Sequence, residues 1–192
     1  MLMTTNHKPR SISMLASPDC ALALIDVQTP LARLMYEHAR LLDNLVRLVK
    51  AAQLFAVPIL WLEQNPRHLG RTVPELSALL SAQSPIEKMA FSACGEPAFL
   101  RQLEQLNRPT VILCGIETHV CIWQSARDVL DRGYAVQVVS DAVSSRTPEN
   151  RALGLQRCEK AGAVITSTEM LLFELLGTAN APQFKDILRL VK

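Results

Sequence analysis

Residues 110–140, TVILCGIETHVCIWQSARDVLDRGYAVQVVS, decide the fold class of this chain. The stretch opens with a continuous apolar run at 110–116, which is typical of a strand buried on both faces of a sheet. A helical pattern at 119–132 then stops at Gly133, a common C-terminal signal, and a second apolar run follows at 134–140. This order of strand, helix and strand predicts a β-α-β unit with parallel strands.

The same alternation extends along the rest of the chain. Further strands are predicted at 21–27, 57–62, 86–89 and 163–166, and further helices at 31–55, 73–82, 96–106, from Thr147-Pro148 onward, 168–176 and 181–191. We therefore predict an α/β fold, a three-layer α/β/α sandwich around a parallel, six-stranded, Rossmann-like sheet. Residues 1–19 are predicted to form an N-terminal extension and residues 20–192 a single domain.

Composition excludes several classes of protein. The 192 residues, 49% of them hydrophobic, suit one domain with a substantial core. With 20 basic and 18 acidic side chains the net charge is +2, so neither a nucleic acid nor a membrane is expected as a partner. The seven glycines form no G-x-G pair, which excludes the dinucleotide fingerprint and the P-loop.

The cysteines and the first residues of the chain predict its compartment. The five cysteines are too sparse for a disulfide scaffold, and no pair has the spacing of a zinc or redox motif. Residues 1–19 have no apolar core of signal-peptide length, and no apolar run is long enough to span a membrane. A cytoplasmic location with reduced thiols is therefore expected.

Three reactive side chains follow predicted strands, and ligands of open parallel sheets bind beyond the carboxyl ends of the strands. Asp26 closes the first strand, Lys88 lies in the third, and Cys121 falls in the first turn of a helix with Thr118 as the expected N-cap. There the helix dipole and a nearby ammonium are expected to lower the pKa of the thiol, and Asp26 could accept its proton. The alternatives are a small buried hydrophobe for Cys121, a helix cap for Asp26 and a solvated loop residue for Lys88.

The motifs LIDVQ, WLEQNP, TVPEL, EK-x-x-FSA, LCGIETHVCIWQSARDVLDRGY and VVSDAVSSR occur in this order along the chain. In order, spacing and strand context they resemble the isochorismatase-like cysteine hydrolase superfamily, which includes nicotinamidases and N-carbamoylsarcosine amidase. The resemblance runs from about Cys20 to Leu176. The form GIETHVC, together with Gln64 and TVPEL, is most similar to the isochorismatase-domain branch.

This resemblance implies an Asp26–Lys88–Cys121 catalytic triad. Cys121 would be the nucleophile, Asp26 the general base and acid, and Lys88 the electrostatic partner of the thiolate. The family's cis peptide maps to Ile116–Glu117, which would direct the backbone N–H of Glu117, together with that of Cys121, at a developing oxyanion. The implied activity is hydrolysis of a small amide-like substrate, breaking a C–N bond through a covalent thiol intermediate.

Two departures from relatives refine this expectation. Metal-binding nicotinamidases carry D-x-H after the first strand, where this chain has Asp26-Val27-Gln28, so neither a metal nor another cofactor is expected. Isochorismatases proper lack the cysteine, so the presence of Cys121 argues against vinyl-ether hydrolysis. That activity stays as an alternative, as does a non-catalytic interaction or scaffold protein on the same fold.

The substrate pocket and the assembly are predicted in less detail. Gln28 and Gln64 could each bind a small polar substrate or tether a loop. The pocket candidates are Gln28, Trp61, Gln64, Phe91 and Thr118.

The family commonly forms homo-oligomers, and the apolar segment 184–191 could either pack on a neighbouring copy or be the last helix of the domain. Asp141 is expected to organise the turn before Thr147.

Overall fold

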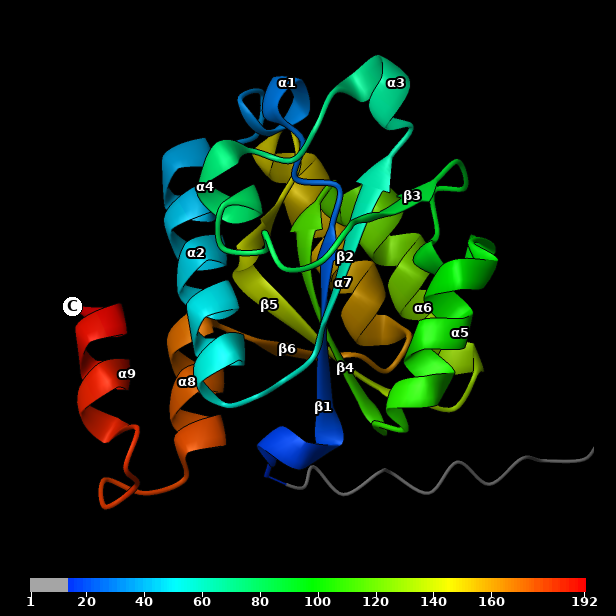
Figure 1. The fold of residues 1–192 in the computed structure, drawn as a ribbon. Coiled ribbons are helices and arrows are strands. Elements are labelled where there is room, and N and C mark those ends of the chain that lie inside the picture. Colours follow the sequence, from blue (N-terminus) through cyan, green and yellow to red (C-terminus); the bar gives the residue numbers. More distant parts are fainter. Residues whose placement is uncertain (1–13) are drawn as a thin grey trace, which may run out of the picture.

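The computed structural model describes residues 14–192, and its centre is a sheet of six parallel strands (Figure 1). The predicted N-terminal extension therefore lies outside the described residues except for positions 14–19. The strands run in the order β3-β2-β1-β4-β5-β6. Their bounds are β1 Cys20–Ile25, β2 Ile59–Gln64, β3 Ile86–Lys88, β4 Thr110–Ile116, β5 Ala135–Ser144 and β6 Val164–Thr166.

Helices cover both faces of this sheet (Figure 1). The helices are α1 Thr29–Ala32, α2 His38–Leu54, α3 Pro66–Leu69, α4 Pro74–Ser77, α5 Pro97–Leu106, α6 Trp123–Asp131, α7 Pro148–Lys160, α8 Thr168–Leu176 and α9 Phe184–Val191. Short 3₁₀ turns occur at η1 Ser17–Asp19 and η2 Ala93–Gly95, and η3 Thr118–Ile122 is a π-helical turn. One apolar core lies between the sheet and α2, α4, α8 and α9, and a second lies between the sheet and α5, α6 and α7. The predicted three-layer α/β/α sandwich is confirmed.

The central strands are apolar along their whole length because both faces of each are covered. Every residue of β1 and of β4 is buried. A side chain pointing to either face thus enters a core, so these strands read as continuous hydrophobic runs rather than as alternating ones. This is the physical reason why the run at 110–116 predicted its strand with the bounds that the structure has.

Some predicted elements differ from the observed ones. The long helix expected over 31–55 is interrupted, because residues after α1 form turns and Glu37 takes a left-handed conformation (φ 51°) just before α2. The helix over 73–82 is regular only in α4, and β5 continues to Ser144 rather than ending at 140. Asp141 lies within β5, where its Oδ1 accepts hydrogen bonds from the N–H and hydroxyl of Thr168, so it holds the start of α8 instead of the turn before Thr147.

Helix α9 belongs to the domain's own core. Its Ile187 is buried, and Phe184, Leu190 and Val191 pack against the cluster that lies beneath α2 and α8. Of the two interpretations of segment 184–191, the structure therefore supports the last helix of the domain.

The parallel arrangement brings the carboxyl ends of the strands to one edge of the sheet, the upper edge in Figure 1. Ile25 at the end of β1 pairs in register with Leu62 of β2 and Gly115 of β4. Gln64 at the end of β2 pairs with Lys88 at the end of β3. Residues far apart in sequence thus meet beyond this edge.

Candidate active site

Asp26, Lys88 and Cys121 come together at this edge. The Lys88 ammonium donates a hydrogen bond to Asp26 Oδ2 at 2.7 Å, and the charge of the same carboxylate acts on the Cys121 thiol. Asp26 and Lys88 are each 1% exposed, and Cys121 is buried as well. Of the alternatives raised by the sequence, a solvated loop position for Lys88 is therefore wrong, and Asp26 caps no helix because Gln28 holds the N-cap position of α1.

The backbone around Asp26 is tightly constrained. Asp26 adopts a left-handed conformation (φ 57°), which is rare for a residue other than glycine. The neighbouring strand reaches it through Gly115, where a methyl group would lie 2.1 Å from the carbonyl oxygen of Ile25. Close approach of the two backbones thus requires glycine at 115 and places the carboxylate where β1 leaves the sheet.

Lys88 is surrounded by oxygen atoms. Besides Asp26 Oδ2, its Nζ donates to Gln64 Oε1 at 2.6 Å and to the carbonyl oxygens of Ala90 at 3.2 Å and Phe91 at 3.1 Å. An ammonium has three protons, so these four acceptors use its whole donor capacity. Lys88 is therefore suited to act as a fixed positive charge.

Cys121 lies in the π-helical turn η3 between β4 and α6. The carbonyl of Glu117 accepts hydrogen bonds from the N–H groups of Val120 and Ile122. The peptide bond between Ile116 and Glu117 is cis. Glu117, not Thr118, holds the N-cap position, and its side chain makes no capping hydrogen bond, so the expected Thr118 cap is wrong.

The ionisation of the thiol differs from the expectation. Burial, followed by the Asp26 charge, raises the pKa of Cys121 from its usual 9.0 to about 12, although Lys88 and the Glu117 backbone act in the opposite direction. Burial also raises the pKa of Asp26, and the Lys88 ammonium opposes that increase. The resting site therefore holds a protonated thiol next to a carboxylate, which can take the proton.

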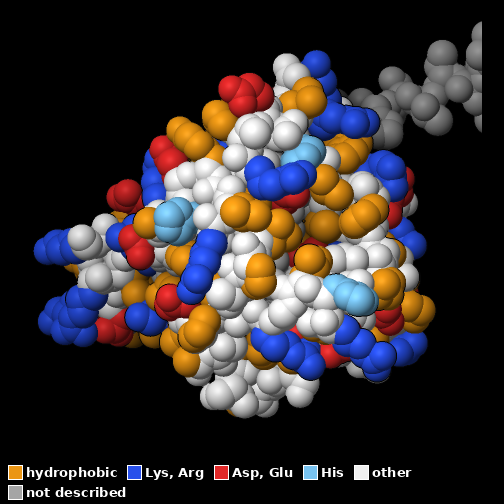
Figure 2. Space-filling view, turned by 90° about the horizontal axis from the view of Figure 1, so that it is seen from above, with side chains coloured by type: hydrophobic (Ala, Val, Ile, Leu, Met, Phe, Trp, Pro, Cys, Tyr) orange, Lys and Arg blue, Asp and Glu red, His pale blue; other side chains and the backbone are white. Residues whose placement is uncertain are grey.

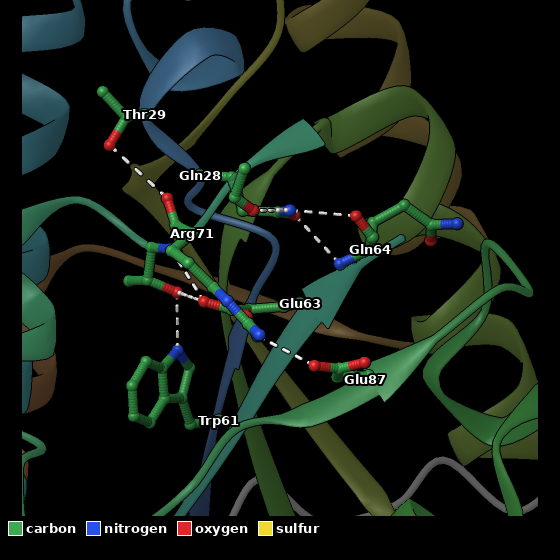
Figure 3. A network of polar contacts seen from close by, with 9 residues as sticks. Gln28, Thr29, Trp61, Glu63, Gln64, Arg71 and Glu87 are labelled. Atoms are coloured by element: carbon green, nitrogen blue, oxygen red, sulfur yellow. Dashed lines mark hydrogen bonds and ion pairs between the residues drawn. The ribbon is translucent and has the colours of Figure 1, made fainter. Parts of the chain in front are cut away.

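Gln28 ties two loops together (Figure 3). Its Nε2 donates to the carbonyls of Gln64 at 2.9 Å and Gly70 at 2.7 Å, and its Oε1 accepts from the N–H of Gln64 at 2.9 Å. The Gln28 side chain is completely buried. Because both ends of the amide are occupied, these contacts favour the loop-tether interpretation of Gln28.

A second polar network lies beside it, on β2 (Figure 3). The buried Glu63 carboxylate accepts from the N–H of Thr72 at 2.7 Å, from its hydroxyl at 2.8 Å and from Arg71 Nη1 at 2.8 Å. Arg71 also contacts Glu87 at 2.8 Å, and the Trp61 indole donates to the Thr72 hydroxyl. Trp61 belongs to the core on the opposite face of the sheet from Cys121, so the structure does not bring it to the thiol.

Two pocket candidates differ in exposure. Thr118 is fully buried next to Glu117, and its hydroxyl has no hydrogen-bond partner among the described residues. Phe91 is 55% exposed, while its carbonyl contacts Lys88. Thr118 therefore keeps an unused hydrogen-bonding group in the same turn as Cys121, and Phe91 exposes its side chain while its carbonyl binds the ammonium.

Arg146 is a residue that sequence reasoning missed. Its backbone N–H and its Nε both donate to Glu117 Oε2, at 3.1 and 3.2 Å, so the loop after β5 holds the side chain of Glu117. His119 Nδ1 is likewise 3.0 Å from the hydroxyl of Ser145. The position of Arg146 shortly after a predicted strand was the only signal in the sequence that could have pointed to it. No sequence motif indicates that Arg146 contacts Glu117.

The molecular surface above the carboxyl ends of the strands carries side chains of several chemical types. Figure 2, which views this upper face, shows hydrophobic side chains interspersed with basic ones. No group of three or more His, Cys, Asp or Glu side chains within residues 14–192 is arranged to hold a metal ion. Over the same residues, each helix is too short or too polar to cross a bilayer.

Comparison with known proteins identifies the family. The isochorismatase domain matches residues 20–170. The chain belongs to the isochorismatase family. This isochorismatase-family chain is 41% identical over 174 residues to isochorismatase domain-containing protein 2 of Bos taurus, covering 89% of this chain and 82% of that protein. It is also 41% identical over 176 residues to the secreted isochorismatase effector Isc1 of Phytophthora sojae, covering 89% and 83% of the two chains.

Solved structures agree with this family assignment. The structure of MAR1 ribonuclease from Caenorhabditis elegans superposes on this isochorismatase-family chain with a TM-score of 0.88 and 36% identity, covering 93% of this chain and 92% of that one. The resemblance inferred from the sequence motifs is thereby confirmed, and with it membership of a hydrolase superfamily.

Proposed function

We propose that this protein is a metal-independent cysteine hydrolase that acts on a small amide-like substrate. The observation that carries the proposal is the buried Asp26 carboxylate, whose Oδ2 accepts a hydrogen bond from the Lys88 ammonium, whose Oδ1 has no partner among the described residues, and whose charge acts on the Cys121 thiol. The two groups that hydrolysis by a cysteine nucleophile needs, a thiol and a base held in position, therefore lie at one site.

In the proposed acylation step, Asp26 accepts the thiol proton as Cys121 Sγ bonds to the substrate carbonyl carbon. The carbonyl electrons move onto oxygen, where the backbone N–H groups of Glu117 and Cys121 stabilise the negative charge. Asp26 then protonates the departing nitrogen, the C–N bond breaks and an amine leaves. The product on the enzyme is a thioester at Cys121.

Deacylation repeats the same proton transfers with water. Asp26 accepts a proton from water as its oxygen bonds to the thioester carbon, and the C–S bond breaks when the sulfur recovers that proton. A carboxylic acid or carbamic acid leaves and the thiol is restored. Lys88 holds the Asp26 carboxylate in position throughout, because its ammonium is anchored by the surrounding oxygens.

The substrate pocket that we propose is smaller than the set of sequence candidates. Thr118 would offer its unpartnered hydroxyl to the substrate, and Phe91 would cover its apolar part. Gln28 is occupied in tethering loops and Trp61 lies in the opposite core. Gln64 contacts Lys88 instead of facing a free space.

The test is a panel of small amides, carbamoyl compounds and esters incubated with the full chain. We expect release of amine together with an acyl adduct of matching mass on the Cys121 peptide. The variant Cys121→Ser should lose both signals, and the matched control Cys94→Ser, in the same core cluster, should keep them. Absence of any adduct or turnover over the whole panel would overturn the hydrolase proposal and favour the scaffold alternative.

Two further arms separate other activities. Isochorismate turnover that survives in Cys121→Ala would favour vinyl-ether hydrolysis. The Caenorhabditis elegans neighbour is named a ribonuclease, so a labelled RNA belongs in the panel. We propose a small-molecule substrate because the net charge of +2 provides little long-range attraction for a polyanion.

We also propose that the protein is cytoplasmic, forms a homo-oligomer and needs no cofactor. One relative at 41% identity is named a secreted effector, so location is best tested directly by fractionation of the source cells. Light scattering on the purified chain gives the oligomeric state, and activity after exhaustive dialysis against a chelator tests the absence of a metal.

A further inference from the structure

Gln64 makes the shortest contact to the Lys88 ammonium. Its Oε1 lies 2.6 Å from Lys88 Nζ, compared with 2.7 Å for Asp26 Oδ2. The ammonium is completely buried, so water does not replace this acceptor. An uncharged amide oxygen thus shares the ammonium with a single carboxylate.

The other end of the Gln64 amide controls the remaining acceptors. Its Nε2 donates to the carbonyl of Met89 at 2.8 Å. The next two carbonyls, those of Ala90 and Phe91, both accept from Lys88. One side chain therefore contacts the ammonium and also holds the segment that supplies two of its other partners.

Gln64 itself has little freedom. Its backbone N–H and carbonyl are both bonded to the Gln28 amide, and it pairs in register with Lys88 across β2 and β3. The side chain is therefore directed at the ammonium by a scaffold that does not depend on Asp26 or Cys121.

We propose that Gln64 is a positioning residue. Its side-chain amide gives Lys88 a neutral acceptor, so that Asp26 is the only negatively charged group that the ammonium contacts. This inference rests on the proposed function for its catalytic meaning. The amide matters because a carboxylate at 64 would compete with Asp26 for one cation. Like charges that share a cation disfavour the ionised forms of both, and of the thiol beside them.

The charged groups around this point are few and mostly paired. Asp26 follows β1, Lys88 closes β3 and Cys121 lies on η3. Glu63 on β2 acts on Asp26 through its charge, but it is paired with Arg71. Glu117 is paired with Arg146. A negative charge introduced at position 64 would thus compete for the Lys88 ammonium, which at present contacts only one carboxylate, that of Asp26.

The experiment compares Gln64→Glu, Gln64→Met and the matched control Gln102→Glu, which lies on the exposed face of α5. Asp26 is titrated by NMR in the full chain labelled with [13C]aspartate, with its signal assigned by Asp26→Asn. The rate of Cys121 alkylation by iodoacetamide is followed by peptide mass spectrometry, and circular dichroism reports folding.

We expect Gln64→Glu to raise the apparent pKa of Asp26 by about one unit and to slow Cys121 alkylation about tenfold at a fixed pH. Gln64→Met should slow alkylation about threefold, because it removes one acceptor of the Lys88 ammonium and the donor that holds the Met89 carbonyl. It should not raise the pKa of Asp26, because it adds no charge. Gln102→Glu should match the wild type in both measurements.

An unchanged Asp26 titration in folded Gln64→Glu, or equal effects from both Gln64 variants, would overturn the proposal. If Gln64→Glu does not fold, Gln64→Met decides: a wild-type alkylation rate contradicts the proposal and a slower one supports it. Failure of both variants to fold would assign Gln64 a purely structural role and also overturn it. None of these readouts needs a substrate, so they stand even if the amide panel shows no turnover.

Discussion

Asp26 Oδ2 accepts a hydrogen bond from Lys88 Nζ at 2.7 Å, and both groups are almost completely buried. Such a pair is expensive to desolvate and is weak evidence for stability alone. Its position beside the only cysteine in the turn after β4 gives it a chemical meaning instead. The ammonium keeps a buried carboxylate in place next to a thiol that burial keeps protonated.

Asp26→Asn should separate thiol acidity from catalysis. The Asp26 charge raises the pKa of Cys121, whereas Lys88 lowers it, so removal of the carboxylate should lower the thiol pKa from about 12. Turnover should nevertheless fall by about 10²–10⁴-fold, because the general base is lost. The pH profile of Cys121 alkylation and kcat/KM measure the two effects. Asp43→Asn on the exposed side of α2 is the control, and a variant that keeps wild-type turnover would exclude Asp26 as the base.

As the pH is lowered, kcat/KM should begin to fall at a pH above the ordinary pKa of an aspartate carboxyl group. Burial raises the pKa of Asp26 above 3.8, and the base works only when ionised. As the pH falls through that raised value Asp26 takes up a proton, so kcat/KM should decline tenfold per pH unit below it. A profile that stays flat down to about pH 4 would contradict the assignment.

Gly154→Ala should distort the turn that carries Cys121. A methyl group at Gly154 on α7 would lie 2.7 Å from the carbonyl carbon of Thr118 and from the nitrogen of His119, both backbone atoms that cannot swing aside. Alanine favours a helix over glycine by about 1 kcal/mol. Overpacking typically costs about 1–3 kcal/mol, so we expect a net loss of stability together with reduced turnover.

Chemical denaturation measures the stability change, and the amide panel measures turnover. The exposed Leu153→Ala on the same helix is the control and should leave turnover unchanged. Increased stability in Gly154→Ala would mean that α7 can move away from η3 without cost.

Thr118→Val should affect substrate binding more than folding. The buried hydroxyl has no partner among residues 14–192, so its replacement by a methyl group removes an unsatisfied polar atom. We expect the free energy of unfolding to stay within about 1 kcal/mol of wild type. KM should rise about 5–10-fold if the hydroxyl bonds the substrate, since a lost hydrogen bond is worth about 1 kcal/mol. An unchanged KM would remove Thr118 from the pocket.

Gln28→Leu should destabilise the loop that follows β2. It would leave the N–H of Gln64 and the carbonyls of Gln64 and Gly70 without their present partner. Each buried unsatisfied group costs about 1–3 kcal/mol, and partial access of water leads us to expect a total of about 2–4 kcal/mol. A urea titration of the variant against wild type checks this, with Gln102→Leu on the exposed face of α5 as the control. A loss below about 0.5 kcal/mol would show that the tether is dispensable.

Much of the fold was predictable because its signals are local. Strands β1 and β4 are buried on both faces, so each had to be a continuous apolar run. Pro148 and Thr147 mark the start of α7, where the Thr147 hydroxyl accepts from the N–H of Asn150. The break at Glu37 was not predictable, because the apolar spacing continues across a left-handed residue that tertiary contacts impose.

The sequence by itself determined the layered α/β fold, the family and the strand ends at which Asp26, Lys88 and Cys121 lie. Periodicity, helix boundaries and ordered motifs are properties of neighbouring residues, so they are readable along the chain. The tertiary structure decided the use of these residues: the four oxygens around Lys88, the tether at Gln28, the Arg146 contact to Glu117 and a thiol that is protonated at rest. These depend on burial and on contacts between residues far apart in the chain, such as the 62 positions between Asp26 and Lys88, and no local pattern records either.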